Sequence, residues 1–203
     1  MFLKLLKIIL WPVFKLLWRF KATYEAPLPK DGPVVLAGKH ISGVDPILVV
    51  ETYNRPIRFM GKAELFKIPV LKWIIKAFGG FPVHRGESDI NALKLSIKIL
   101  RDGQVLGIMP EGHRVSSIDN IQLKSGAMNL AAKTKATLVP FGIYTKDYKM
   151  KLFRRFEIRY GRPIPYEEYA PDGITKEQID ELTHTLLKDE IVRLSQKDYK
   201  EGM

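Results

Sequence analysis

The first stretch of the chain combines large apolar side chains with regularly spaced basic ones, a pattern typical of an amphipathic helix. At about 100° per residue, the basic side chains of residues 2–20 fall within roughly a third of the helical circumference; they are Lys4, Lys7, Lys15 and Arg19. The longest apolar run, residues 8–14, is shorter than the ~20 residues that a membrane span needs. The pattern predicts a helix lying in a membrane interface, with three aromatic side chains in the acyl boundary: Trp11, Phe14 and Trp18. An amphipathic helix docked on the protein's own domain is the alternative interpretation.

A second segment, residues 64–78, repeats this combination. Lys72 and Lys76 share one helical face, and the apolar side chains exceed what one buried stripe requires. The hypothesis is a further element that contacts the membrane or lines an acyl chain, with Phe66 and Trp73 as its contact residues. A core helix with solvated lysines explains the same pattern equally well.

Strand-like apolar runs alternate with helix-like segments over the rest of the chain. The predicted strands are 34–37, 57–60, 81–84, 104–109, 137–144 and 153–160, the last at or near a sheet edge. The predicted helices are 89–101, 125–134 and one opened by a capping box at Thr175 and Gln178, with Ile179, Leu182, Leu186 and Leu194 facing inward. The order predicts a single α/β domain, residues 25–203, with a mixed, largely parallel sheet flanked by helices. Residues 1–24 are predicted to form the membrane-interface helix.

Composition narrows the function classes. The chain has 203 residues, 33 Lys+Arg against 22 Asp+Glu, a formal net charge of +11 and no cysteine. The missing cysteine excludes disulfide scaffolds, Fe–S clusters and cysteine nucleophiles, and the charge indicates polyanionic partners. Residues 1–85 hold 14 Lys or Arg against 5 Asp or Glu, whereas residues 86–203 hold 19 against 17. Because the excess lies where the large apolar side chains cluster, it favours a lipid surface over nucleic acid.

Candidate chemistry begins directly after the first strand of the predicted domain. His40 and Asp45 are separated by four residues in a loop that contains Gly43. If the loop folds back, the carboxylate takes one imidazole N–H and leaves the other nitrogen as a general base for a hydroxyl. A surface histidine in a turn, with Asp45 capping the next helix, is the simpler alternative for this pair taken alone.

Three further clusters follow apolar strands or lie within one. Residues 79–86 contain Arg85, residues 109–116 contain Glu111 and Arg114, and residues 138–143 contain Pro140. Open α/β sheets keep their ligand sites at strand ends, and arginines bind phosphate with two parallel hydrogen bonds. Arg85 and Arg114 are therefore candidate phosphate ligands.

These four clusters, in this order and spacing, closely resemble the glycerolipid acyltransferase family, and within it the bacterial 1-acyl-sn-glycerol-3-phosphate acyltransferases of the PlsC type. His40 and Asp45 match the H-x4-D block, and 80–85 matches the second block, which ends in Arg. Residues 110–114, Pro-Glu-Gly-His-Arg, match the P-E-G-T-R block, and 139–140 match the last. Two residues depart from the pattern: Lys39 stands where Asn is usual, and His113 where Thr is usual.

The resemblance implies transfer of a fatty acyl group from a thioester, acyl-CoA or acyl-acyl carrier protein, to the sn-2 hydroxyl of lysophosphatidic acid, giving phosphatidic acid. His40 would act as base, oriented by Asp45, and the acceptor phosphate would contact Arg85, Glu111, Gly112, Arg114 and Lys39. No bound cofactor is implied. With the charge pattern, this indicates a peripheral or monotopic protein on the cytoplasmic face of the cell membrane.

Other classes of function explain less of the sequence. The sequence contains no H-E-x-x-H motif, so no metal site is predicted. It contains neither G-x-x-x-x-G-K-[ST] nor G-x-G-x-x-G, so no nucleotide site is predicted. A non-catalytic basic module that binds anionic membrane or nucleic acid would explain the charge, but it leaves the four ordered blocks as coincidence. Acylation of a different lysophospholipid by the same mechanism also stays open, and nucleic acid is not an expected partner.

Overall fold

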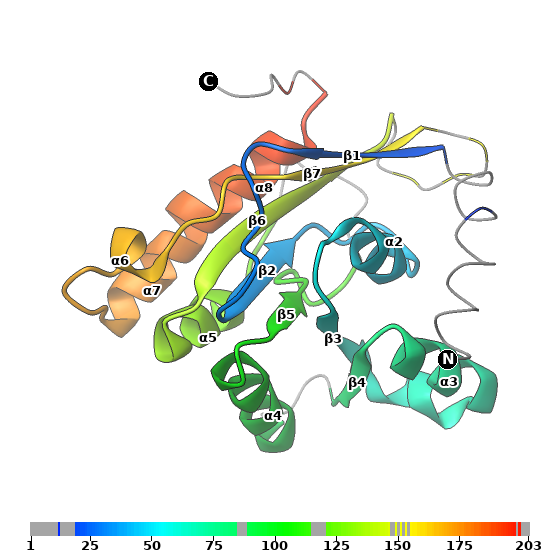
Figure 1. Cartoon of the computed structure of the whole chain (residues 1–203), viewed down its shortest axis with the longest axis horizontal. Helices are drawn as coiled ribbons and strands as arrows, with labels where there is room; N and C mark the ends of the chain where they lie inside the picture. Colours follow the sequence, from blue (N-terminus) through cyan, green and yellow to red (C-terminus); the bar gives the residue numbers. More distant parts are fainter. Residues whose placement is uncertain are drawn as a thin grey trace.

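The computed structural model describes residues 12, 19–84, 89–114, 121–146, 149, 151, 153, 155–197 and 199. Seven strands form one sheet in the order β1-β7-β6-β2-β5-β3-β4 (Figure 1). Their bounds are β1 Phe20–Tyr24, β2 Val34–Gly38, β3 Ile57–Lys62, β4 Gly80–Val83, β5 Val105–Ile108, β6 Thr137–Tyr144 and β7 Phe156–Tyr160. Every neighbouring pair is parallel except β6 and β7. The predicted mixed, largely parallel sheet is confirmed.

Helices cover both faces of the sheet and bury two apolar clusters. The first cluster packs under α4 Ile90–Arg101, α5 Gly126–Thr134, α7 Lys176–Leu182, η2 Thr183–Leu187 and α8 Lys188–Ser195. The second lies on the opposite face, under α2 Asp45–Thr52 and α3 Pro69–Ala77. The remaining helical pieces are η1 Ala63–Lys67 and α6 Tyr166–Tyr169. This two-sided cover explains why the central strands are almost continuously apolar.

The centre of the sheet determines where the motif residues meet. Strand β2 is buried at every position and lies between β5 and β6. Its pairing with β5 runs from Val34–Val105 to Ala37–Ile108. Because the strands are parallel, the residues after Gly38 and those after Ile108 leave the sheet at the same edge.

The C-terminal helix begins as predicted. Thr175 accepts a hydrogen bond from the Gln178 N–H, and the Gln178 side chain accepts one from the Thr175 N–H, which completes the capping box. The helix then continues through a π-helical turn, η2, into α8. Ile179 and Leu194 are buried as expected, and Leu182 and Leu186 are partly buried.

Three elements differ from the prediction. Phe20–Tyr24 form β1 at the sheet edge, paired with β7, and not the end of an amphipathic helix. The helix expected over 64–78 is divided into η1 and α3 by extended backbone at Ile68, the residue before Pro69. Strand β7 begins only at Phe156, since Phe153 has a positive φ of 62°.

Most of the predicted membrane-interface helix, including Trp11, Phe14 and Trp18, lies outside the described residues. Within the described part of the chain, no helix is both long enough and apolar enough to cross a bilayer.

Candidate functional site

The His40 loop, residues 39–45, is organised around one carboxylate oxygen. Oδ2 of Asp45 accepts hydrogen bonds from the His40 ring at Nδ1 (2.9 Å), the Ile41 N–H (2.7 Å) and the Ser42 N–H (2.6 Å). Asp45 is fully buried, whereas His40 keeps 9% of its surface exposed. Because a carboxylate only accepts, Nδ1 carries the ring hydrogen, and Nε2 is left with a lone pair that can take a proton.

Glu111 holds the same loop from the neighbouring strand. Its Oε2 accepts a 2.8 Å hydrogen bond from the backbone N–H of His40. The carboxyl group is 2% exposed, and burial raises its pKa to about 7, opposed by the His40 N–H and by the charge of Lys39. The Lys39 side chain is also fully buried. Neither Glu111 nor Lys39 presents its charge to solvent.

Basic side chains lie on the exposed side of the loop. A methyl group added at Gly43 would be 3.4 Å from Nη2 of Arg114, so this exposed guanidinium lies beside the His40 loop. A methyl group at Gly112 would be 3.6 Å from Nζ of Lys124. Sequence reasoning missed Lys124, which lies outside the four blocks and carries no motif signal.

Gly112 has a conformational role in this arrangement. Its φ of 72° lies in the left-handed region, and its N–H donates to the Met109 carbonyl at 3.0 Å. The N–H of Lys124 donates to the Pro110 carbonyl at 2.9 Å, which closes the turn from the other side. The Gly112 N–H therefore builds the turn and does not point toward a substrate.

A second His–Asp pair has the same spacing but a different environment. His84 donates its backbone N–H to Asp89 at 2.9 Å, and its Nδ1 lies 3.1 Å from the same oxygen. The ring is 73% exposed, and Asp89 also caps α4 by accepting from the Ala92 N–H. The His84 N–H is the main reason that the pKa of Asp89 falls to about 2. The two pairs therefore share their spacing and differ in burial.

Of the remaining residues predicted to contact phosphate, membrane or an acyl chain, the described ones do not gather around His40. Arg85 lies outside the described residues. Phe66 is partly buried against Gly61, and Trp73 is 41% exposed on α3. No cluster of three or more His, Cys, Asp or Glu side chains suited to a metal ion occurs in the part of the chain that the structure describes.

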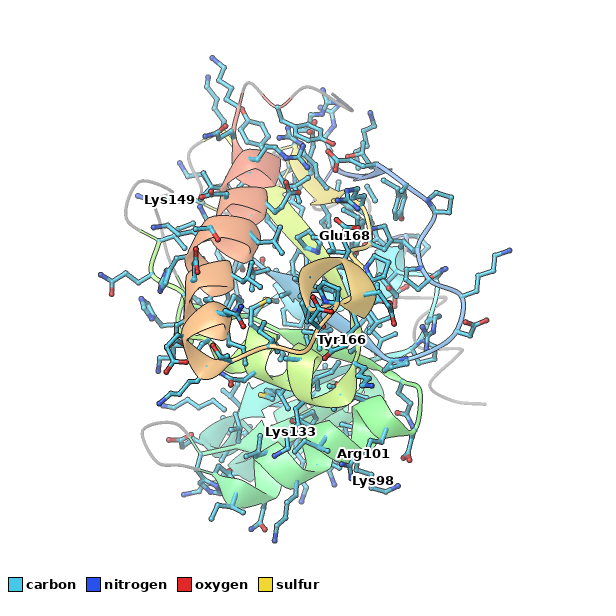
Figure 2. All side chains as sticks on the ribbon, turned by 90° about the vertical axis from the view of Figure 1, so that its left-hand side faces the viewer. Lys98, Arg101, Lys133, Lys149, Tyr166 and Glu168 are labelled. Atoms are coloured by element: carbon cyan, nitrogen blue, oxygen red, sulfur yellow. The ribbon has the colours of Figure 1, made fainter. Side chains whose placement is uncertain are left out.

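A cleft of about 650 Å³ lies between α4, α5 and the segment before α7. Its lining is mainly apolar and includes Met60, Val83, Leu93, Leu130 and Ile179. Tyr166 and Lys133, labelled in Figure 2, also line it. Met60 and Val83 lie in the C-terminal halves of their strands, close to the sheet edge that carries the His40 loop.

Comparisons with known proteins agree with this geometry. The sequence model of the Acyltransferase family matches residues 19–144. A 1-acyl-sn-glycerol-3-phosphate acyltransferase of Bacillus subtilis is 32% identical over 162 residues, which are 78% of this chain and 80% of that protein. A protein of the same name from Borreliella burgdorferi is 30% identical over 59% of this chain and 49% of its own length.

One solved structure has a similar fold over almost the whole chain. It is the 1-acyl-sn-glycerophosphate acyltransferase PlsC of Thermotoga maritima, with a TM-score of 0.71 and 21% identity. The match covers 95% of this chain and 79% of that one.

Proposed function

Because the chain belongs to the Acyltransferase family, we propose that it moves a fatty acyl group from a thioester to the sn-2 hydroxyl of 1-acyl-sn-glycerol-3-phosphate, giving phosphatidic acid. The observation that carries the proposal is the His40 ring held by the buried Asp45 carboxylate. The names of the curated relatives support the acceptor.

The proposed chemistry needs one base and no covalent enzyme intermediate. Nε2 of His40 takes the hydroxyl proton while the hydroxyl oxygen attacks the thioester carbonyl. The imidazolium that forms is stabilised by Asp45, whose Oδ2 lies 2.9 Å from Nδ1. When the tetrahedral intermediate collapses, the C–S bond breaks and the imidazolium protonates the leaving thiolate. The products are the new ester and a free thiol, and His40 returns to its starting state.

The acceptor phosphate is proposed to bind beside the His40 loop. The exposed Arg114 guanidinium, next to Gly43, suits bidentate binding of a phosphate. Lys124, over Gly112, adds a second positive charge on the same side. Arg85 remains a proposed ligand from its place in the second sequence block.

The cleft beside α4 and α5 is proposed to hold an acyl chain. Its apolar lining fits a hydrocarbon, and helices α4 and α5 both begin at the edge of the sheet that carries His40. Leu93→Trp would shorten the usable cleft, so competition between acyl lengths should shift toward shorter chains. An unchanged chain-length profile would exclude this cleft as the acyl site.

Helix α3 and the residue before it are proposed to contact an anionic lipid surface. Val70 and Ile68 are 70% and 53% exposed, and Trp73 is 41% exposed. Lys67, Lys72 and Lys76 are exposed among them, and no acidic residue occurs between positions 65 and 84. Apolar side chains interleaved with lysines are typical of a surface that enters the headgroup layer.

Vesicle flotation tests this surface in the full chain. Ile68→Ser with Val70→Ser should weaken binding to vesicles that contain phosphatidylglycerol by roughly tenfold. Ile90→Ser, at a 60% exposed position on α4, is the matched control and should leave binding unchanged. Equal binding by all three proteins would remove α3 from the interface. Deletion of residues 1–18 tests the contribution of the N-terminal segment separately.

His40→Ala tests the catalytic proposal. Loss of the base should lower kcat by about 10²–10⁴-fold with lysophosphatidic acid and an acyl thioester. His84→Ala is the matched control, because its ring has the same H-x4-D spacing but is exposed. Acyl transfer at the wild-type rate in His40→Ala would exclude the mechanism. Vesicle binding with no turnover in the wild type would favour the non-catalytic basic module.

The donor and the acceptor are identified by a substrate panel. Acyl-CoA and acyl-acyl carrier protein are the proposed donors, and lysophosphatidic acid is the proposed acceptor. Mass spectrometry of the products, with other lysophospholipids in parallel, separates phosphatidic acid synthesis from acylation of a different head group. We infer that the enzyme works peripherally on the cytoplasmic face of the cell membrane.

A further inference from the structure

Two ionisable side chains are buried at the His40 loop, one within it and one hydrogen-bonded to its backbone. Lys39 is fully buried and Glu111 is 2% exposed. Burial of a charge is costly unless an opposite charge or a hydrogen bond compensates it. The acyl-transfer steps above use neither group, so another role must account for this pair.

The position of the pair relative to the sheet indicates that role. Pairing between β2 and β5 ends at Ala37 and Ile108. His40 and Glu111 each lie three residues beyond that last pair, so they leave the sheet side by side. The hydrogen bond from the His40 N–H to Oε2 of Glu111, 2.8 Å long, continues the connection between the two chains where the backbone ladder has ended.

His40 is therefore held at two points. Asp45 holds the imidazole ring, and Glu111 holds the backbone from which that ring projects. Base catalysis depends on placement of Nε2, because a shift of about 1 Å in a reacting group can cost a hundredfold in rate.

Of the charged groups near Glu111 in the described part of the chain, only Lys39 favours its ionised form. Lys39 and the His40 N–H lower the pKa of Glu111, whereas Asp45 on the same loop raises it and burial raises it most. The second oxygen of Glu111, Oε1, has no hydrogen-bond partner within the described ranges. The His40 N–H and the Lys39 ammonium are thus the two groups of this set that compensate a negative charge on Glu111, and Lys39 is the one that carries a full positive charge.

We propose that Glu111 positions the catalytic histidine by holding its backbone N–H, and that the buried Lys39 is the opposite charge that pairs with this carboxylate. This inference rests on the proposed function, and it replaces the expectation that both residues contact the acceptor phosphate. A buried carboxylate would repel a phosphate, and the exposed Arg114 is better placed for that contact. Glu111 and Lys39 are positioning residues and not catalytic ones.

Steady-state kinetics with three variants test the positioning role. Glu111→Gln keeps a side-chain oxygen for the His40 N–H and should lower kcat only a few-fold, whereas Glu111→Ala should lower it by about a hundredfold. The acceptor KM should change by less than about twofold in both variants, because no phosphate contact is lost. A large rise in the acceptor KM with kcat unchanged would overturn the proposal in favour of a direct phosphate contact.

A double-mutant comparison isolates the charge pair. Lys39→Met should lower kcat and the urea midpoint of the wild type, because it leaves the Glu111 charge uncompensated. In the Glu111→Gln background the same change should have little further effect. Lys176→Met, at an exposed lysine on α7, is the control for loss of a positive charge. Equal, additive effects of Lys39→Met in both backgrounds would show that the two side chains do not interact.

The two proposals fail in distinguishable ways. If His40→Ala keeps full activity, the proposed mechanism is wrong, but the coupling between Lys39 and Glu111 in the urea midpoints is still measurable. If His40→Ala is inactive and that coupling is absent, the charge pair alone is wrong. Glu111→Gln, which is nearly isosteric, covers the case in which Glu111→Ala fails to fold.

Discussion

Asp45 holds both the loop backbone and the His40 ring through one carboxylate oxygen. Its Oδ2 shapes the loop through the N–H groups of Ile41 and Ser42 and orients the ring of His40. An amide at this position would keep one oxygen for these contacts, but it would lose the negative charge and would bury an NH2 group where Oδ1 has no hydrogen-bond partner among the described residues. Loop geometry and histidine tautomer are therefore coupled through one residue.

Asp45→Asn should separate these roles. We expect kcat to fall by about 10²–10⁴-fold, since the imidazolium loses its counter-charge and the ring loses its preferred tautomer. Thermal unfolding should show a smaller effect, because the side-chain volume is unchanged. Activity within threefold of the wild type would mean that His40 does not depend on this carboxylate.

The raised pKa of Glu111 makes the free energy of unfolding depend on pH, in a direction that can be worked out. Folding raises its pKa from 4.5 to about 7, so the native state binds more protons than the unfolded state between these values. Stability should therefore fall as pH rises through this window, by about 3 kcal/mol at most. The difference in unfolding free energy between Glu111→Gln and the wild type should grow from pH 5 to pH 8. A difference that stays constant with pH would contradict the raised pKa.

At the scale of single residues, the sequence predicted which side chains lie at the site better than it predicted what each of them contacts. The His40–Asp45 contact follows from the H-x4-D spacing, and the structure contains it. The role of Glu111 could not be predicted, because it depends on the register between two strands that are about seventy residues apart in sequence. Likewise, His84 and Asp89 have the same spacing as His40 and Asp45, and only burial separates the two pairs.

Among the secondary-structure elements, β6 and α8 approach each other closely at Gly142. A methyl group at Gly142 would clash with the Leu194 backbone, which cannot move without shifting α8. Gly142→Ala should therefore lower the unfolding free energy by about 1–3 kcal/mol. Gly126→Ala, where an added methyl group meets no atom within 4 Å, should leave stability unchanged or slightly raised. Urea denaturation of the two variants checks the contrast, and equal midpoints would contradict the packing.

Several of the strands that the sequence predicted are buried in the centre of the sheet, whereas the missed strand, β1, lies at its edge. Buried strands such as β2 and β5 show as apolar runs because both faces are covered. Strand β1 reads Phe-Lys-Ala-Thr-Tyr and is only partly buried at an edge. Its partner β7 lies far away in the sequence, so no local pattern distinguishes β1 from the end of the preceding amphipathic segment.

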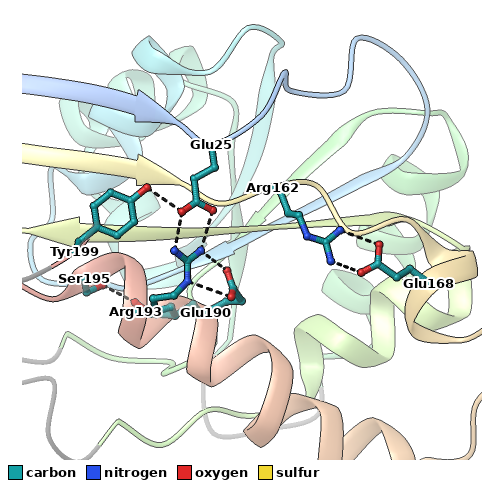
Figure 3. A network of polar contacts seen from close by, with 8 residues as sticks. Glu25, Arg162, Glu168, Glu190, Arg193, Ser195 and Tyr199 are labelled. Carbon is teal, nitrogen blue, oxygen red and sulfur yellow. Dashed lines mark hydrogen bonds and ion pairs between the residues drawn. The ribbon is translucent and has the colours of Figure 1, made fainter. Parts of the chain in front are cut away.

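At the scale of the whole molecule, a polar network joins the start of the domain to its last helix (Figure 3). Arg193 on α8 makes two hydrogen bonds to Glu25, which follows β1, and a further ion pair to Glu190. Tyr199 donates its hydroxyl hydrogen to Glu25 at 2.8 Å, and its ring lies under both Arg159 and Arg193. The edge strand and the C-terminal helix are thus connected by one network.

Arg193→Met should lower the unfolding free energy by about 2 kcal/mol, because Glu25 is largely buried and would lose both charged hydrogen bonds. The Arg193 hydrogen bonds are the main reason that the pKa of Glu25 is lowered. This contribution is therefore present above the ordinary pKa of a glutamate and is lost as the pH falls.

Arg162→Met is the matched control for this network. Its partner Glu168, also drawn in Figure 3, is exposed, so the loss should be below about 1 kcal/mol. Urea denaturation at neutral and acidic pH compares the two variants. Equal losses would mean that the Glu25 network has no more weight than a surface pair.

Contacts between distant parts of the chain were the hardest feature to predict. Net charge and hydropathy indicated a basic, lipid-facing N-terminal part, and α3 has the exposed lysines and apolar side chains expected of it. The network around Glu25 joins residues that are more than 160 positions apart, and nothing in the local sequence marks them as partners.

The parallel pairing of β2 and β5 also acts as a check on correct folding. A slip of one residue would move the two strands by about 3.3 Å relative to each other, and it would separate His40 from Glu111. The same slip would turn buried side chains of either strand toward the opposite face. A chain with a misaligned sheet would therefore lose both its core packing and the contact that holds the His40 backbone.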